Sequence, residues 1–149
     1  MFDSILVVCA GNICRSPMAK GVFDNLLKHR FVEVTSAGLI ALEGREADEN
    51  AIRVANKNGI SLAGHKGKQL TAQLVTDNAL ILVMEQRHLD YLCTNYPVAR
   101  GKVFLLAKWT DNTDIPDPYM QSPESFEYVF DLIKSACSAW QKYILVEQS

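Results

Sequence analysis

The first seventeen residues place a buried strand, a short loop and a helix start in immediate succession. Ile5-Leu6-Val7-Val8 is a continuous apolar run, which is typical of a strand covered on both faces of a parallel sheet. Ser16-Pro17 then offers an N-cap residue and a proline at the first helical position. The chain is therefore restricted to folds in which a buried strand leads through a tight loop into a helix.

The same alternation of strand and helix signals continues along the chain. Further strands are predicted around 32–36, 79–84 and 103–106, and further helices over 48–59, 85–96 and 122–144. No linker, repeat or low-complexity segment interrupts this order. The pattern predicts a single α/β domain over residues 1–149, with three layers: a four-stranded parallel sheet and helices on both faces.

Composition narrows the environment and the partners. The 149 residues are 48% apolar, which suffices for one buried core without disulfide bonds. The net charge of −2 provides no general attraction for nucleic acid or a membrane. There is no long apolar run and no signal-peptide pattern. We therefore expect a cytoplasmic protein without membrane insertion, whose four cysteines are reduced thiols.

The loop between the first strand and the first helix is suited to binding a tetrahedral oxyanion. Cys9 ends the strand and Arg15 follows six residues later, where its guanidinium can grip two oxygens. Inward-pointing backbone N–H groups and the helix N-terminus would add positive potential, which favours a nucleophilic thiolate at Cys9. Gly11 and Asn12 tolerate the positive φ of such a curl. The predicted phosphate-binding residues are Ala10, Gly11, Asn12, Ile13, Cys14, Arg15 and Ser16.

A second loop, near the end of the last predicted strand, offers a proton donor. Asp117 stands between Pro116 and Pro118, which stiffen the backbone on both sides. Both loops leave the carboxyl edge of the sheet, so they can meet. Asp111 and Asp114 are alternative acids that lack the flanking prolines. The three histidines are scattered and no metal-binding spacing occurs, so we predict no metal and no cofactor.

The run from Val8 to Pro17 resembles the phosphate loop of low-molecular-weight protein-tyrosine phosphatases. The resemblance extends to residues 36–38, to Gly64-His65 and to residues 117–119, and so covers essentially the whole chain. In detail the sequence is most similar to the bacterial branch associated with tyrosine kinases of polysaccharide export. The resemblance implies hydrolysis of phosphotyrosine through a phosphocysteine on Cys9, with Arg15 binding phosphate and Asp117 acting first as acid and then as base.

The resemblance also implies supporting roles. Tyr119 and Leu42 would form the rim of the substrate pocket, and Ser36 and His65 would brace Asn12. Cys14 would form a protective disulfide with Cys9 after oxidation. The expected substrate is a phosphotyrosine protein or peptide, in particular the tail of a bacterial tyrosine autokinase, and we expect a monomer.

Two other functions are compatible with the fold. An arsenate reductase would need further cysteines to relay a disulfide to the surface, and Cys93 and Cys137 are not a close pair in the sequence. A phosphotyrosine-binding module without catalysis would lack the nucleophile or the acid, whereas Cys9 and Asp117 are both present. Turnover of p-nitrophenyl phosphate without metal distinguishes the phosphatase from both alternatives.

Overall fold

A four-stranded parallel sheet forms the centre of the computed structural model, which describes residues 2–146. The strand order is β2-β1-β3-β4, so β1 lies between β2 and β3. In register, Cys9 at the end of β1 lies opposite Gly38 at the end of β2. The carboxyl ends of the strands therefore share one edge of the sheet. The strands are β1 (Ser4–Cys9), β2 (Glu33–Gly38), β3 (Leu80–Val83) and β4 (Val103–Leu105).

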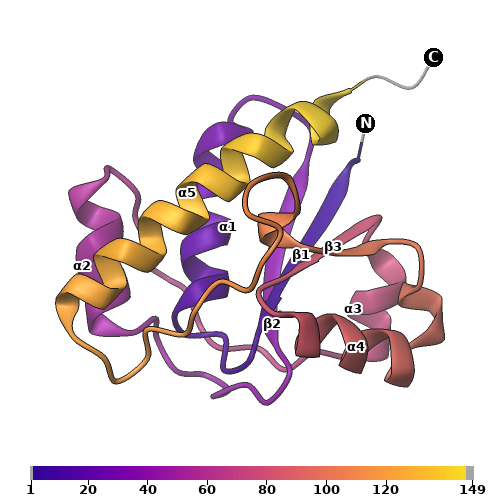
Figure 1. Ribbon diagram of the computed structural model, residues 1–149, viewed down its shortest axis with the longest axis horizontal. Helices are drawn as coiled ribbons and strands as arrows, with labels where there is room; N and C mark the ends of the chain where they lie inside the picture. Colours follow the sequence, from indigo (N-terminus) through magenta and orange to yellow (C-terminus); the bar gives the residue numbers. More distant parts are fainter. Residues whose placement is uncertain (1, 147–149) are drawn as a thin grey trace.

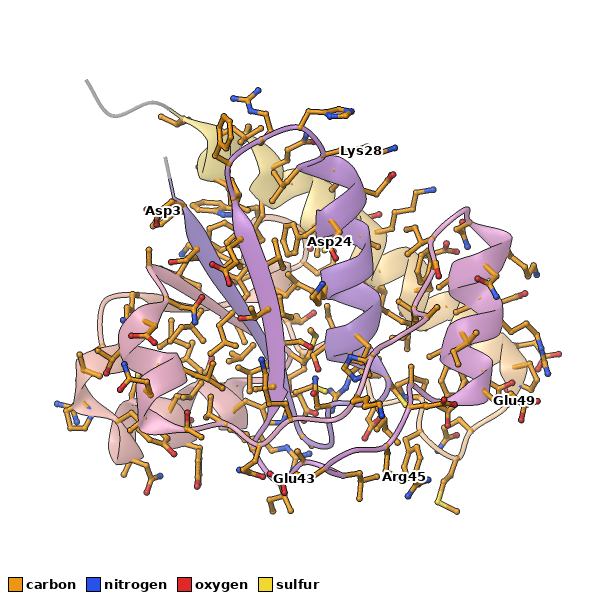
Figure 2. All side chains as sticks on the ribbon, turned by 180° about the vertical axis from the view of Figure 1, so that it is seen from behind. Asp3, Asp24, Lys28, Glu43, Arg45 and Glu49 are labelled. Atoms are coloured by element: carbon orange, nitrogen blue, oxygen red, sulfur yellow. The ribbon has the colours of Figure 1, made fainter. Side chains whose placement is uncertain are left out.

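Helices cover both faces of this sheet, which confirms the predicted three-layer α/β fold (Figure 1). Ile5 and Val7 of β1 point into one core, while Leu6 and Val8 point into the other, as the period of two requires. Charged side chains such as Lys28 and Glu49 lie on the outside (Figure 2). One face carries α1 (Arg15–Leu26), α2 (Glu49–Lys57) and α5 (Pro123–Leu145), and the other carries α3 (Ala72–Asp77) and α4 (Gln86–Asn95).

Helix α5 shows how local signals and packing combine. Ser122 caps its N-terminus by accepting a hydrogen bond from Ser125 N at 3.3 Å, and Pro123 follows at the first helical position. Phe126 and Phe130 are fully buried, and each contributes about 1.5–3 kcal/mol of hydrophobic free energy. The helix is thereby fixed across α1. Within residues 2–146, no helix is both long enough and apolar enough to cross a bilayer.

The start of α1 differs from the prediction that Ser16 is its N-cap. The helix begins at Arg15 with Cys14 as N-cap, and Cys14 O already accepts a helical hydrogen bond from Met18 N. Ser16 therefore lies in the first turn, and its hydroxyl contacts Cys9 and Asn12 instead of a backbone N–H. The tight curl of the preceding loop reaches helical geometry earlier than the Ser-Pro signal indicates.

Short elements account for the remaining differences. Thr71 caps the six-residue helix α3 through a bond from Leu74 N, and this helix was not predicted. A 3₁₀-helix over Pro97–Ala99 and another over Leu106–Trp109 were also missed, and the second ends β4 at Leu105. Such short segments carry too little periodicity to be recognised from sequence.

Candidate active site

The loop from Cys9 to Arg15 is held with its carbonyl groups facing the surrounding protein. The carbonyl oxygens of Cys9, Ala10, Gly11 and Ile13 accept hydrogen bonds from the backbone N–H groups of Leu39, Ile40, Leu42 and Asp48 at 2.8–3.0 Å. The N–H groups of residues 10–14 have no partner among the described residues. Successive unpaired amides on the inner side of a curled loop form a cradle for an anion.

Asn12 fixes the shape of this cradle. It is fully buried and adopts a positive φ of 60°, whereas Gly11 does not adopt a positive φ. Its side-chain N–H groups donate to Ser16 Oγ at 2.7 Å and to Ser36 Oγ at 3.1 Å, and its Oδ1 accepts from Lys68 N at 2.9 Å. The interactions of one side chain thus stabilise a backbone conformation that Asn adopts more readily than most residues.

His65 adds a bond to the backbone of the same residue. Its Nε2 lies 2.7 Å from Asn12 O, and because a carbonyl can only accept, Nε2 carries the proton. Partial burial lowers the pKa of His65, and the positive charges of Lys20 and Lys68 lower it further. The hydrogen bond to Asn12 raises the pKa but is outweighed. The ring is therefore a neutral donor near pH 7. Ser36 and His65 both contact Asn12, the residue that they were predicted to brace.

Cys9 lies at the base of the cradle, at the end of β1. Its Sγ is 3.0 Å from Ser16 Oγ. Since Ser16 Oγ already accepts a hydrogen bond from Asn12, its own hydroxyl hydrogen is free to point at the sulfur. This arrangement suits a sulfur that carries negative charge.

Arg15 is 99% buried, an unusual position for a guanidinium. Its Nη1 donates to Glu85 Oε2 at 2.6 Å and to the carbonyl oxygen of Ile115 at 2.8 Å. Burial opposes ionisation of Glu85, but hydrogen bonds from Arg87 and Arg15 outweigh it and lower the pKa of Glu85 to about 2. Arg15 is thus paired with a permanent carboxylate, which satisfies its charge and fixes its direction.

Asp117 lies close to Arg15. Its Oδ2 is 3.7 Å from Arg15 Nη2, and its Oδ1 accepts a hydrogen bond from Tyr119 N at 3.0 Å. The side chain is 45% exposed, so water can reach it. Asp114 is occupied elsewhere, because its Oδ1 accepts from Gln86 N at the start of α4. Of these two acids, the geometry therefore places Asp117 at the cavity.

A cavity of about 230 Å³ opens between the cradle and the Asp117 loop. Leu42 and Tyr119 are part of its lining, and so is Ile40, which the sequence did not single out. The side walls are mostly apolar, while the base is polar. The lining consists of Cys9, Ala10, Gly11, Ile13, Cys14, Arg15, Ile40, Leu42, Asp117 and Tyr119.

Cys14 is a second free thiol in this lining. Burial raises its pKa, and the nearby Asp48 and Cys9 raise it further. It is therefore a protonated thiol at neutral pH. Among residues 2–146, no three His, Cys, Asp or Glu side chains are grouped closely enough to hold a metal ion.

Sequence reasoning missed three residues that position the site. Glu85 and Ile115 hold Arg15 from segments 70 and 100 residues away. Gly38 lies under the loop, where an added Cβ would come within 2.8 Å of Ala10 O. A signal for Glu85 was available, since a carboxylate directly after a buried strand lies at the carboxyl edge, where ligands bind.

Fold and cradle together define an α/β domain that binds an oxyanion beside a cysteine at the carboxyl edge of its sheet. Residues 4–149 match the family described as low molecular weight phosphotyrosine protein phosphatase. The Wzb protein-tyrosine-phosphatase of Escherichia coli K12 is 44% identical over 148 residues, which cover 99% of each chain. The chain belongs to the low molecular weight phosphotyrosine protein phosphatase family.

Solved structures agree with this assignment. Wzb of Escherichia coli K30, in complex with sulphate, is 46% identical and superposes with a TM-score of 0.92 over 97% of this chain and 99% of its own. Vibrio vulnificus Wzb, in complex with benzylphosphonate, is 44% identical, with a TM-score of 0.92 over 96% of this chain and 99% of its own.

Proposed function

We propose that this protein hydrolyses phosphotyrosine in proteins through a phosphocysteine intermediate on Cys9. The observation that carries the proposal is the cradle itself: unpaired amides of residues 10–14 surround a space with the Cys9 sulfur at its base. A tetrahedral dianion would satisfy these amides, and Arg15 would bind two of its oxygens. Membership of the phosphatase family supports the same conclusion.

The first chemical step transfers the phosphoryl group to sulfur. Cys9 Sγ attacks phosphorus, the S–P bond forms and the bond to the tyrosyl oxygen breaks. Asp117 gives its proton to that oxygen. A phenolate, whose conjugate acid has a pKa near 10, is a poor leaving group unless it is protonated as the bond breaks. Loop amides and Arg15 hold the three equatorial oxygens, whose charge develops during transfer.

The second step regenerates the thiolate. Asp117, now ionised, removes a proton from water, and the resulting oxygen attacks phosphorus as the S–P bond breaks. The hydroxyl of Ser16, 3.0 Å from Cys9 Sγ, donates to the departing sulfur. Inorganic phosphate then leaves the cradle. Both steps use side chains of this chain alone.

The cavity favours an aromatic substrate over a shorter phosphorylated side chain. Ile40, Leu42 and Tyr119 form a largely apolar wall beside the cradle, which suits the flat face of a phenyl ring. A phosphoserine is too short to span this wall while its backbone stays outside. We therefore expect turnover of phosphotyrosine peptides and slow turnover of phosphoserine peptides.

For the cellular substrate, we propose the phosphorylated tail of a bacterial tyrosine autokinase. The similarity to the bacterial branch of the family supports this choice. We further propose that the protein acts in the cytoplasm as a monomer. Capture of a phosphorylated kinase by Cys9→Ser protein tests the substrate, and light scattering at working concentration tests the monomeric state.

The decisive test is metal-free turnover of p-nitrophenyl phosphate and a phosphotyrosine peptide. Cys9→Ser should lose at least about three orders of magnitude in kcat while still binding phosphate. Arg15→Lys should lose about two orders in kcat/KM, because an ammonium group cannot grip two oxygens. Cys93→Ser, outside the site, is the matched control and should remain active. Activity near that of the wild type in Cys9→Ser would overturn the mechanism.

A further inference from the structure

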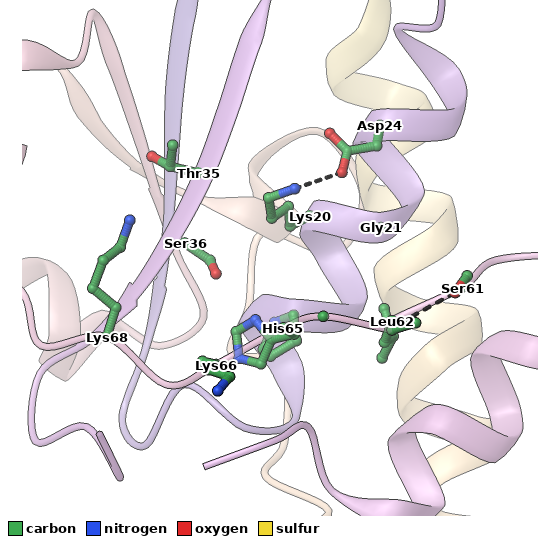
Figure 3. A pocket seen from close by; sticks show the side chains of 13 residues that line it. Lys20, Gly21, Asp24, Thr35, Ser36, Ser61, Leu62, His65, Lys66 and Lys68 are labelled. Atoms are coloured by element: carbon green, nitrogen blue, oxygen red, sulfur yellow. Dashed lines mark hydrogen bonds and ion pairs between the residues drawn. The ribbon is translucent and has the colours of Figure 1, made fainter. Parts of the chain in front are cut away.

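A second and larger cavity lies on the other side of the phosphate loop from the active site. Its volume is about 510 Å³, roughly twice that of the substrate cavity. It opens between the start of α1, the edge strand β2 and the segment 61–68 (Figure 3). Among the residues that line it are Lys20, Lys66 and Lys68, and we call it the lysine cavity.

Positive charge dominates the lysine cavity, although the whole chain has a net charge of −2. Lys20 is paired with Asp24 at 2.7 Å, a contact visible in Figure 3. Lys66 and Lys68 form no ion pair with any carboxylate of residues 2–146. Three ammonium groups against one carboxylate leave an excess of positive charge at a concave surface, which attracts anions.

Ser36 offers a hydroxyl donor on the face of β2 that turns toward α1. Ser36 Oγ accepts a hydrogen bond from Asn12, so its own hydrogen remains free to donate. Leu62 and Pro17 add apolar surface to the same cavity. The combination of ammonium groups, a hydroxyl and apolar surface suits an organic phosphate with more than one negative charge.

The wall of the lysine cavity is connected to the active site. His65 and Lys68 bond to Asn12 O and Asn12 Oδ1, and both belong to the segment that lines the cavity. Between them, Gly67 exchanges backbone bonds with Gly44 and Arg45, on the loop that carries the pocket rim. A ligand that moved this segment would change the bonds that hold the phosphate loop.

We propose that the lysine cavity is a second anion site, which takes a small molecule bearing a diphosphate group and is coupled to the phosphate loop through Asn12. A diphosphate carries enough negative charge to balance the ammonium groups of Lys66 and Lys68, which form no ion pair within residues 2–146. The site is separate from the substrate cavity, with which it shares no lining residue.

The test measures binding of pyrophosphate and of adenosine diphosphate while the active site is filled. The full chain is saturated with benzylphosphonate, the ligand of the similar Vibrio vulnificus structure, and titrated by calorimetry. We expect one site for at least one of the two probes. Lys20→Ala combined with Lys66→Ala should weaken binding at least about tenfold through the loss of charge-assisted contacts.

The matched control is Lys28→Ala combined with Lys134→Ala, which removes the same charge elsewhere. Lys28 lies just beyond the C-terminal end of α1 (Figure 2). The affinity of this control variant for the probe should be the same as that of the wild type. Coupling is read from the side-chain amide signals of Asn12 by NMR, which should shift as the probe binds.

Three outcomes would overturn the proposal. In the first, neither probe binds at millimolar concentration. In the second, both double variants bind the probe equally well. In the third, the probes only displace benzylphosphonate. Binding without a shift at Asn12 would overturn the coupling. All of these results are independent of whether the protein turns over phosphotyrosine.

Discussion

Arg15 Nη1 donates to Glu85 Oε2 across 2.6 Å, although the two residues are 70 positions apart in the chain. The guanidinium is 1% exposed and the carboxylate 14% exposed, so solvent screens the pair only weakly. A phosphate in the cradle therefore meets an Arg15 whose direction is already fixed by Glu85 from behind.

Replacing Glu85 should impair catalysis without removing any group that contacts substrate. In Glu85→Gln the neutral amide no longer anchors Arg15, and we expect a loss of about 10- to 100-fold in kcat/KM, with weaker inhibition by phosphate. Asp90→Asn, one helical turn later and exposed, is the control. Equal phosphate inhibition constants for Glu85→Gln and wild type would show that Glu85 does not position Arg15.

Asp117→Asn should preserve the fold and lower kcat for a phenyl phosphate by about two to four orders of magnitude, the range for losing a general acid or base. A strongly activated aryl phosphate needs less protonation, so its single-turnover burst should be slowed much less. Asp114→Asn should not show this dependence on the leaving group. Rapid-quench measurement of the burst rate tests this dependence on the leaving group. Identical losses for both leaving groups would exclude Asp117 as the proton donor.

Gly38→Ala tests the close approach of β2 to the phosphate loop. An added Cβ would lie 2.8 Å from Ala10 O and 3.0 Å from Asn12 Cβ, so the loop must shift. We expect kcat/KM to fall at least about tenfold. The control is Gly101→Ala, a turn glycine at φ 89° with open space around it, which should lower stability but leave kcat/KM unchanged. Urea denaturation of both variants separates the two effects.

The buried His88 should make the stability of the fold sensitive to acid. Burial lowers its pKa to about 4, with Glu85 opposing the shift and Arg15 and Arg87 adding to it. Between about pH 6.5 and 4 the unfolded chain therefore binds a proton that the native state does not. This group alone should lower the free energy of unfolding by about 1.4 kcal/mol for each pH unit of acidification within that window.

The acid effect is checked by urea denaturation of wild type and His88→Leu at several pH values between 7 and 4. The slope of the unfolding free energy against pH should be shallower in the variant. The exposed His29 provides the control His29→Gln. An unchanged slope in His88→Leu would contradict the assignment.

Cys14 should protect Cys9 against irreversible oxidation. Peroxide converts the Cys9 thiolate to a sulfenic acid, and attack by the Cys14 thiol expels water and forms a disulfide. Dithiothreitol should therefore restore the oxidised wild type but not Cys14→Ser. By intact mass, the wild type should lose about two mass units and the variant should gain about 32. Identical products and recovery would leave Cys14 with no protective role.

Much of the fold was predictable from sequence because its signals are local. The apolar run of β1 and the capped, striped helix α5 each carry their own pattern, so Cys9 could be placed at a strand end. Asp117 lay in a loop that had to leave the same sheet edge.

What escaped prediction depends on distant partners. Glu85 resembles any helix-start carboxylate until the parallel pairing of β1 with β3 brings Arg15 beside it. Gly38 becomes necessary only because Ala10 packs against it. The start of α1 was misplaced because Ser16 turns its hydroxyl toward Cys9, and no local pattern shows that choice.

The cradle whose shape Asn12 fixes has a consequence for inhibition of the enzyme by its own product. Because the amides of the cradle face the phosphoryl oxygens, which both anions share, the cradle itself should bind a phosphoryl group on tyrosine and the free orthophosphate that hydrolysis releases. The end product thus competes directly with substrate. We therefore expect turnover to slow as orthophosphate accumulates around the enzyme.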